Sequence, residues 1–133
     1  MIVVDNVEKS FGKVRAVRGV SFRADDGRIT GLLGPNGAGK STTLRMLYTV
    51  IRPDAGRAEI DGTDVVRSPL EARARIGTLP HGSGLYPHLT ARENIRYYAA
   101  LYGVDEEVMD ARVQAVIDDL GISQEVLPVG LND

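Results

Sequence analysis

One octapeptide has residue types and spacing suited to binding phosphate. GPNGAGKS, Gly34–Ser41, fits the pattern G-x-x-x-x-G-K-[ST]. Glycines let such a loop curl until successive N–H groups point inward at phosphate oxygens, and a following helix adds its positive N-terminal end. The loop therefore predicts a site for the phosphates of a nucleotide.

The residues predicted to contact the phosphates are consecutive: Asn36, Gly37, Ala38, Gly39, Lys40, Ser41 and Thr42. Lys40 is expected to reach the β and γ phosphates, and the Ser41 hydroxyl to ligate Mg²⁺, which prefers oxygen. Thr42 offers another hydroxyl near the α phosphate. Lysine is scarce in this chain, yet it stands where a compact point charge suits a phosphate. The alternative is a glycine-rich turn that ends in Lys-Ser by chance.

The chain's two histidines lie close together in LPHGSGLYPH, Leu79–His88. A structural or catalytic metal site needs three or four ligands, and the chain has neither cysteine nor a second histidine pair. A metal site at this pair is therefore disfavoured. His81 and His88 are expected to have separate roles.

The composition is typical of a soluble globular protein of one ordinary domain. The 133 residues are 43% hydrophobic and 26% charged. The net charge is −2 and the basic residues are scattered, which disfavours a nucleic-acid partner. The longest apolar run, Tyr97–Val104, is far shorter than the roughly 18 residues that a membrane span requires. Any role at a membrane would have to involve a partner.

The elements around the phosphate loop are predicted from apolar periodicity. Residues 2–7 and 14–22 predict two antiparallel strands joined by a turn at Phe11-Gly12. The apolar run Ile29–Leu33 predicts a strand buried on both faces of a parallel sheet. A helix is expected from Gly39, and its apolar face is predicted from four residues at helical spacing: Leu44, Leu47, Tyr48 and Ile51.

Later elements are predicted in the same way. Thr90 and Glu93 have the spacing of a capping box, which predicts the start of a helix. The predicted elements are, in chain order, a strand at 58–60, a helix at 69–74, a strand at 76–79, and helices at 91–102 and 106–120. The last helix has apolar residues at helical spacing: Val113, Val116, Ile117 and Leu120.

Together these motifs resemble the N-terminal half of an ATP-binding cassette, the nucleotide-binding subunit of ABC transporters. The resemblance covers the whole chain, and three segments carry it: Phe11–Leu47, Ile51–Gly62 and Ile76–Ile95. The third segment, with GLYPHLTARENI, is most similar to sodium-extruding (NatA-type) and drug-exporting subunits. The implied fold class is α/β, with an incomplete RecA-like P-loop NTPase core. An N-terminal antiparallel β-subdomain and helices after the glutamine-loop position complete that fold.

The resemblance also implies roles outside the phosphate loop. Phe11 would stack on the adenine, since an aromatic face serves any base; the alternative is a core phenylalanine at the turn. His81 stands where the family has a glutamine whose oxygen approaches Mg²⁺ and the attacking water. Imidazole is a poor Mg²⁺ ligand but can hydrogen-bond water or a phosphate oxygen, so a catalytic role at His81 departs from the family's chemistry. His88 is expected to be a surface or partner contact.

Three catalytic parts of the family are not visible in the sequence: a strand ending in Asp-Glu, a serine-glycine signature and a switch histidine. VIDDL, Val116–Leu120, is the one candidate for the Asp-ending strand, with Asp118 and Asp119 as catalytic carboxylates. Its apolar run is short and its apolar residues keep helical spacing, so we instead expect Asp118 and Asp119 on a solvated helix face. Residues 1–133 are therefore interpreted as a partial ABC-type ATP-binding domain. Such a chain should bind ATP and Mg²⁺ but lack hydrolysis, because nothing orients the water.

For the full-length protein the resemblance implies an ATPase that powers a transporter, an exporter by subfamily, through ATP binding and hydrolysis. It would lie peripherally on the cytoplasmic face of the cell membrane. Its expected partners are a transmembrane permease subunit and a second cassette in a head-to-tail dimer. Tyr86 and Leu89 would contact the permease, or else pack in the core. Two alternatives remain: a soluble ABC-type ATPase in DNA repair or translation, and a nucleotide-binding module without turnover.

Overall fold

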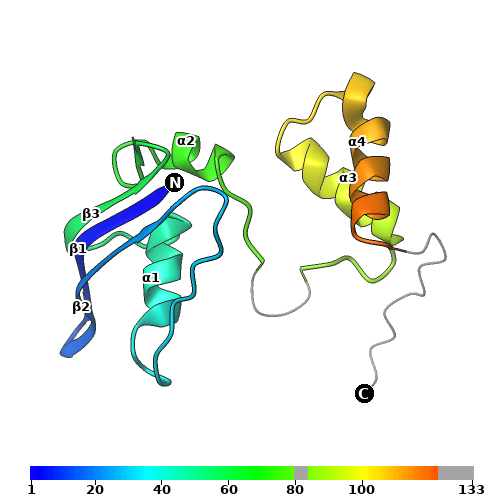
Figure 1. The fold of residues 1–133 in the computed structure, drawn as a ribbon. Helices are drawn as coiled ribbons and strands as arrows, with labels where there is room; N and C mark the ends of the chain where they lie inside the picture. Colours follow the sequence, from blue (N-terminus) through cyan, green and yellow to red (C-terminus); the bar gives the residue numbers. More distant parts are fainter. Residues whose placement is uncertain (80–83, 123–133) are drawn as a thin grey trace, which may run out of the picture. The chain divides into compact units, whose positions relative to one another are not determined.

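The computed structural model describes residues 1–79 and 84–122, which fall into two compact units (Figure 1). The first unit comprises Met1–Thr78 and the second begins at Leu79. Each unit has a hydrophobic cluster of its own. The phosphate loop belongs to the first unit, whereas Tyr86 and the predicted capping box belong to the second.

The first unit is built on a four-stranded antiparallel sheet with the strand order β2-β1-β3-β4. Its strands are β1 (Ile2–Phe11), β2 (Val14–Ala24), β3 (Ala55–Ile60) and β4 (Thr63–Asp64). The predicted hairpin is confirmed, because Ile2 pairs with Ala24 and Phe11 with Val14. The strand predicted at 58–60 is also confirmed and is longer than expected. The two-residue strand β4 is not predicted from the sequence.

The helix α1 (Lys40–Leu47) packs against this sheet, and α2 (Pro69–Ala74) follows β4. The prediction for α2 is confirmed. In α1, the predicted apolar face is wrong at Leu44, which is 37% exposed, because the buried side chains are Thr43, Met46 and Leu47. Thr43 is buried although it is polar, since its hydroxyl donates to the carbonyl of Gly39 at 2.9 Å.

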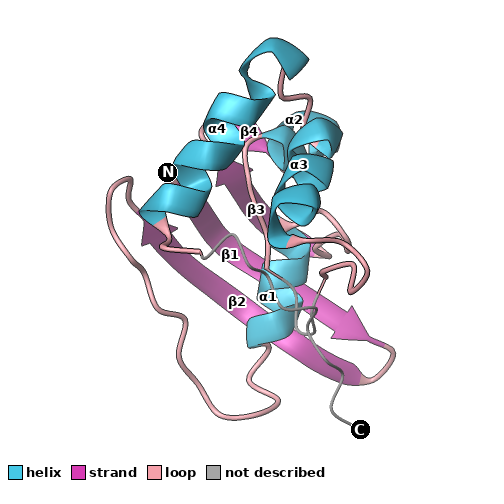
Figure 2. Ribbon diagram, turned by 90° about the vertical axis from the view of Figure 1, so that its right-hand side faces the viewer, coloured by secondary structure: helices cyan, strands magenta, loops and turns pink. Residues whose placement is uncertain are grey.

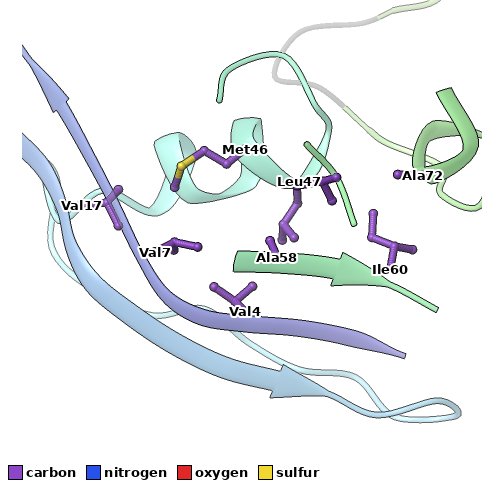
Figure 3. Close-up of a cluster of buried hydrophobic side chains, with 9 residues drawn as sticks. Val4, Val7, Val17, Met46, Leu47, Ala58, Ile60 and Ala72 are labelled. Carbon is purple, nitrogen blue, oxygen red and sulfur yellow. The ribbon is translucent and has the colours of Figure 1, made fainter. Parts of the chain in front are cut away.

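The core of the first unit lies between the sheet and the two helices (Figure 3). Side chains from β1, β2 and β3 point toward Met46 and Leu47 of α1 (Figure 3). The buried members are Val4, Val7, Val17, Met46, Leu47, Ala58, Ile60, Val65 and Ala72. In Figure 2, α1 lies in front of the long β1–β2 hairpin. Burial against three strands fixes the body of α1, and therefore the helix that follows the phosphate loop.

Two predicted strands, at 29–33 and 76–79, are wrong in this structure, because both segments are irregular. Ile29 and Leu33 are fully or almost fully exposed, at 104% and 93%. A strand forms only where a neighbour pairs its N–H and C=O groups, and the sheet of the described residues includes neither segment. The apolar pattern is that of a buried strand, but no strand of the described residues pairs with either segment.

The second unit contains α3 (Ala91–Leu101) and α4 (Glu106–Asp119), which pack side by side. Met109, Val113 and Ile117 form its buried centre, whereas Val116 and Leu120 of the predicted apolar face are exposed. Arg96 of α3 pairs with Glu106 and Asp110 of α4. Asp118 and Asp119 lie exposed on α4, as predicted.

The predicted capping box is confirmed at the start of α3. The Thr90 hydroxyl accepts from the N–H of Glu93 at 3.2 Å, and the Glu93 carboxylate accepts from the N–H of Thr90 at 2.7 Å. The hydrogen bonds from the Thr90 N–H and hydroxyl hold the pKa of Glu93 below its ordinary value of 4.5. The cap is therefore fully formed above that pH and is lost as pH falls through the lower folded pKa.

Thr90→Ala should weaken the first turn of α3 by about 1 kcal/mol, seen as roughly fivefold faster amide exchange there. The matched control is Ser68→Ala. Ser68 also precedes a helix, but its side chain makes no cap hydrogen bond, so exchange in α2 should not change. Equal effects of the two substitutions would contradict this assignment.

Candidate nucleotide-binding site

The phosphate loop is closed by its own lysine. The Lys40 ammonium donates to the carbonyl oxygens of Gly34 and, at 2.7 Å, Pro35. The Ala38 N–H donates to the Pro35 carbonyl at 3.2 Å, which makes a turn inside the loop. Residues 34–38 are exposed to solvent. The Lys40 ammonium therefore lies on a backbone ring that is formed by residues 34–40 and is accessible to solvent. A positive charge on an accessible loop of this kind suits the binding of a polyanion.

The N-terminal end of α1 carries no side chain that neutralises it. Gly39 is the N-cap, no side-chain cap hydrogen bond is present, and the first turn holds no acidic residue. The first N–H groups of a helix have no intrahelical acceptor, and they carry the positive end of the helix dipole. Ser41 is exposed in that first turn, and Thr42 is half-buried. The first turn of α1 thus offers N–H groups and hydroxyls directly after the loop that Lys40 closes.

Gly39 fixes the end of the loop against β2. Its φ of +86° lies in the left-handed region, and a Cβ there would come within 2.2 Å of the Ala16 carbonyl oxygen and 3.1 Å of Val17 Cγ2. Gly37 has a similar φ of +82°, but a Cβ added to it would meet nothing within 4 Å. Gly37 is thus required by conformation alone, whereas Gly39 is required by conformation and by close packing.

Phe11 lies outside the buried core, at the end of β1, with 49% of its surface exposed. The Lys9 ammonium is 5.6 Å from the centre of the Phe11 ring. Lys9 is held by Asp54 at 2.7 Å, and hydrogen bonds from Lys9 and the Ser10 N–H lower the pKa of Asp54. The core alternative for Phe11 is therefore not supported, and the ring has an accessible face.

Phe11 and the phosphate loop approach the same stretch of β2. Phe11 pairs with Val14, and Gly39 meets β2 at Ala16. Two residues of strand separate these points, which is about 7 Å. The hairpin thus provides one frame for an aromatic ring and a phosphate loop.

His81 lies outside the described residues, but the segment from Tyr86 to Thr90 is ordered around a buried asparagine. Asn94, only 4% exposed, accepts from the N–H of Tyr86 at 2.8 Å. Its Nδ2 group donates to the carbonyl oxygens of Tyr86, Leu89 and Thr90. Sequence reasoning misses Asn94. The available signal is an asparagine near the start of a helix, where its side chain can find backbone partners in the preceding loop.

Tyr86 is exposed, and it stands on a cluster of tyrosines. Its ring meets Tyr97 edge-on at 4.9 Å between centroids, and its hydroxyl donates to that of Tyr97 at 3.2 Å. This hydrogen bond raises the pKa of Tyr86. Tyr98 donates to the carbonyl of Gly84. Leu89 is half-buried and His88 is exposed, so Tyr86 and His88 are surface residues of this loop.

Residues 1–79 and 84–122 contain no group of three or more His, Cys, Asp or Glu side chains placed to hold a metal ion. A Mg²⁺ ion at the phosphate loop would instead rest on the Ser41 hydroxyl and on oxygens of the ligand. Over the same residues, no helix has the length and apolarity needed to cross a membrane.

Residues 17–130 match the protein family described as ABC transporter. The chain belongs to this family. It is 42% identical over 110 residues to the ABC transporter ATP-binding protein NatA of Bacillus subtilis (strain 168), a match covering 82% of this chain and 45% of that protein. The daunorubicin resistance ATP-binding protein DrrA3 of Streptomyces coeruleorubidus is 40% identical over 117 residues, which cover 88% of this chain and 37% of that protein. The chain thus spans less than half the length of the curated relatives it matches.

Solved structures of ABC ATP-binding subunits share the fold. A structure titled as the ATP binding subunit of an ABC transporter superposes with a TM-score of 0.79 at 27% identity, over 92% of this chain and 51% of that one. A dimeric ATP-binding cassette with ADP and Pi gives a TM-score of 0.73 at 24% identity, over 92% of this chain and 58% of that one. The predicted ABC family and its incomplete α/β P-loop NTPase fold are confirmed.

Gly39→Ala should destabilise the first unit more than Gly37→Ala. Both substitutions place a Cβ at positive φ, which costs about 1–2 kcal/mol. Gly39→Ala also forces the loop away from Ala16, and overpacking of this kind adds about 1–3 kcal/mol. Urea unfolding measures both changes. Equal losses for the two variants would show that Gly39 is not packed on β2.

Proposed function

We propose that this chain is the nucleotide-binding part of an ABC transporter subunit and that it binds ATP with Mg²⁺ at the phosphate loop. The observation that carries the proposal is the Lys40 ammonium on an exposed ring of backbone, beside the uncapped N-terminal end of α1. A triphosphate is the ligand whose charge suits this arrangement, because it accepts hydrogen bonds from several N–H groups and from an ammonium at once.

Each residue of the loop has a role in the proposed complex. The Lys40 ammonium would exchange its carbonyl acceptors for the β and γ phosphates, and the Ser41 hydroxyl would ligate Mg²⁺. Thr42 would donate near the α phosphate. Backbone N–H groups complete the cradle, and they come from Asn36, Gly37, Ala38 and Gly39. The conformational freedom of glycine at Gly37 and Gly39 lets these groups converge.

Phe11 is proposed to stack on the adenine. Its exposed ring sits on the same hairpin as the docking point of the loop, separated along β2 by the distance estimated above. Lys9 lies 5.6 Å from the ring centre, but its charge is paired with Asp54, so the proposed contact with the base rests on the Phe11 ring. An aromatic ring stacks on any base, so Phe11 would contribute affinity with little discrimination between ATP and GTP.

The proposed role in transport concerns the whole protein. It would hydrolyse ATP as one of two cassettes and drive a transmembrane permease from the cytoplasmic face of the membrane. The names of relatives in drug resistance and Nod factor export support an exporter. His81 would contact the attacking water, and the exposed Tyr86 would contact the permease. Asp118 and Asp119 lie exposed on α4. We propose that this chain binds ATP without turnover, because its sequence shows no strand ending in Asp-Glu that would orient the attacking water.

Lys40→Ala should abolish Mg-ATP binding by the chain, which isothermal calorimetry measures. The loss of charge-assisted hydrogen bonds to phosphate corresponds to a drop in affinity of at least about a hundredfold. Arg112→Ala, which removes an equal charge from an exposed position on α4, is the control and should bind normally. Phosphate release by the chain should not exceed the buffer rate. Retained affinity in Lys40→Ala would refute the proposed site.

Phe11→Ala should weaken Mg-ATP binding by about tenfold, because a stacked base contributes about 1–3 kcal/mol. Phe11→Tyr keeps an aromatic face and should bind within about twofold of the natural chain. The same calorimetric titration measures both. If Phe11→Ala binds as tightly as Phe11→Tyr, the base does not stack on this ring.

A further inference from the structure

The helix that follows the phosphate loop ends at a threonine in a left-handed conformation. Thr49 has a φ of +62°. The Thr49 N–H donates to the Met46 carbonyl and the Val50 N–H to the Arg45 carbonyl, both at 3.0 Å. These two bonds make a Schellman motif, in which the left-handed residue is usually glycine. A β-branched residue at this position is an outlier, and residues held in such a conformation cost about 1–3 kcal/mol.

A side chain of α2 holds this strained residue. Arg73 donates through Nε to the Thr49 hydroxyl and through Nη2 to the Thr49 carbonyl oxygen at 3.2 Å. The planar guanidinium group provides two donors in a fixed geometry that a lysine lacks. Glycine would remove the strain but would also remove the hydroxyl that Arg73 contacts. Thr49 therefore keeps a strained conformation, and its contacts with Arg73 link the end of α1 to α2.

Both ends of α1 are thus held by specific contacts. The helix has eight residues and is about 12 Å long. Its first residues are Lys40 and Ser41, and Gly39 anchors that end on β2. Arg73 anchors the other end. The burial of Met46 and Leu47 holds α1 on the sheet, and Arg73 adds a restraint at the end of the helix beyond that core. Because a short helix moves as a rigid body, loss of this restraint permits a small tilt of its first turn relative to β2 and to Phe11.

We infer that Arg73 is a positioning residue for nucleotide binding and that it acts through Thr49 on the orientation of α1. The inference rests on the proposed function, because it assigns a consequence to the phosphate site at the opposite end of the helix. Nucleotide affinity and the Arg73–Thr49 contact are then energetically coupled, and coupling of this kind changes affinity by about fivefold or more. A contact that serves stability alone has no such effect on affinity.

Thr49→Gly separates the two roles. It relieves the left-handed strain, so the urea midpoint of the chain should stay the same or rise. It also removes the hydroxyl contact, so the dissociation constant for Mg-ATP should rise about fivefold. If the contact served stability alone, the affinity for Mg-ATP would not change. Asn6→Gly is the matched control, because Asn6 also has a positive φ, of 47°, but lies in β1; it should leave affinity unchanged.

Arg73 is tested by Arg73→Ala and Arg73→Lys, with Arg75→Ala as the control. Arg75 lies two residues further along, is exposed, and pairs with Glu71 at 2.9 Å. Calorimetry should show affinity about fivefold weaker for Arg73→Ala, partly restored in Arg73→Lys, and normal for Arg75→Ala. Circular dichroism establishes that each variant is folded before titration.

The outcomes separate this inference from the proposed function. If the natural chain binds Mg-ATP, Lys40→Ala does not, and the Thr49 and Arg73 variants bind normally, only the positioning role is overturned. If the natural chain does not bind Mg-ATP, the proposed function is overturned and this inference with it. Weaker binding by Thr49→Gly at unchanged or higher stability, together with weaker binding by Arg73→Ala, supports the positioning role.

Discussion

The close approach of Gly39 to the backbone of Ala16 is the constraint on which the first unit depends. It allows the phosphate loop to turn beside β2 directly into α1, with no room for a side chain between them. The burial of Met46 and Leu47 against β1, β2 and β3 then fixes the direction of α1. The same hairpin that receives Gly39 presents Phe11 at its end. Backbone packing at one glycine thus sets the spacing between a cationic loop and an aromatic ring.

The second unit is held by a different kind of interaction. Its apolar centre is small, but Asn94 satisfies four backbone groups of the preceding loop and is itself buried. A buried amide with every group paired imposes one conformation, because any rearrangement would leave polar atoms unsatisfied. The loop therefore presents Tyr86 at the surface in a defined position, supported by the edge of Tyr97. The surface around Tyr86 thus has a fixed conformation although the apolar core of the second unit is small.

Local signals in the sequence predict local structure well. The capping box at Thr90, the proline-initiated helix at 69–74 and the β1–β2 hairpin are all predictable, because each depends on residues close in sequence. The segments 29–33 and 76–79 have strand patterns and are irregular, because a strand exists only with a partner from elsewhere in the chain. The predicted apolar face extends the helix to Ile51, but α1 ends at Leu47. Its earlier end escapes prediction because threonine does not signal a left-handed residue, and the Thr49 conformation is stabilised by Arg73, which is distant in sequence. Asn94 escapes prediction for a different reason: its partners lie within eight residues, but apolar periodicity does not reveal hydrogen bonds from a side chain to the backbone.

In the candidate site, the groups for binding a nucleotide are close together in the sequence, whereas the groups for hydrolysing it would come from distant elements. In the proposed complex, affinity for phosphate would depend on groups within a few residues of one another: the Lys40 ammonium, the first N–H groups of α1 and the Ser41 hydroxyl. Orientation of a water for attack depends on groups brought from distant elements and held at hydrogen-bond distance. Ile29 precedes the loop with its side chain fully exposed, so among the described residues the loop is supported from the side of β2 and α1. Support of the loop by β2 and α1 would be enough for binding. Catalysis would also need groups on the side of the loop away from β2 and α1. In the proposed function, nucleotide recognition by this chain would therefore not depend on the groups that nucleotide turnover requires.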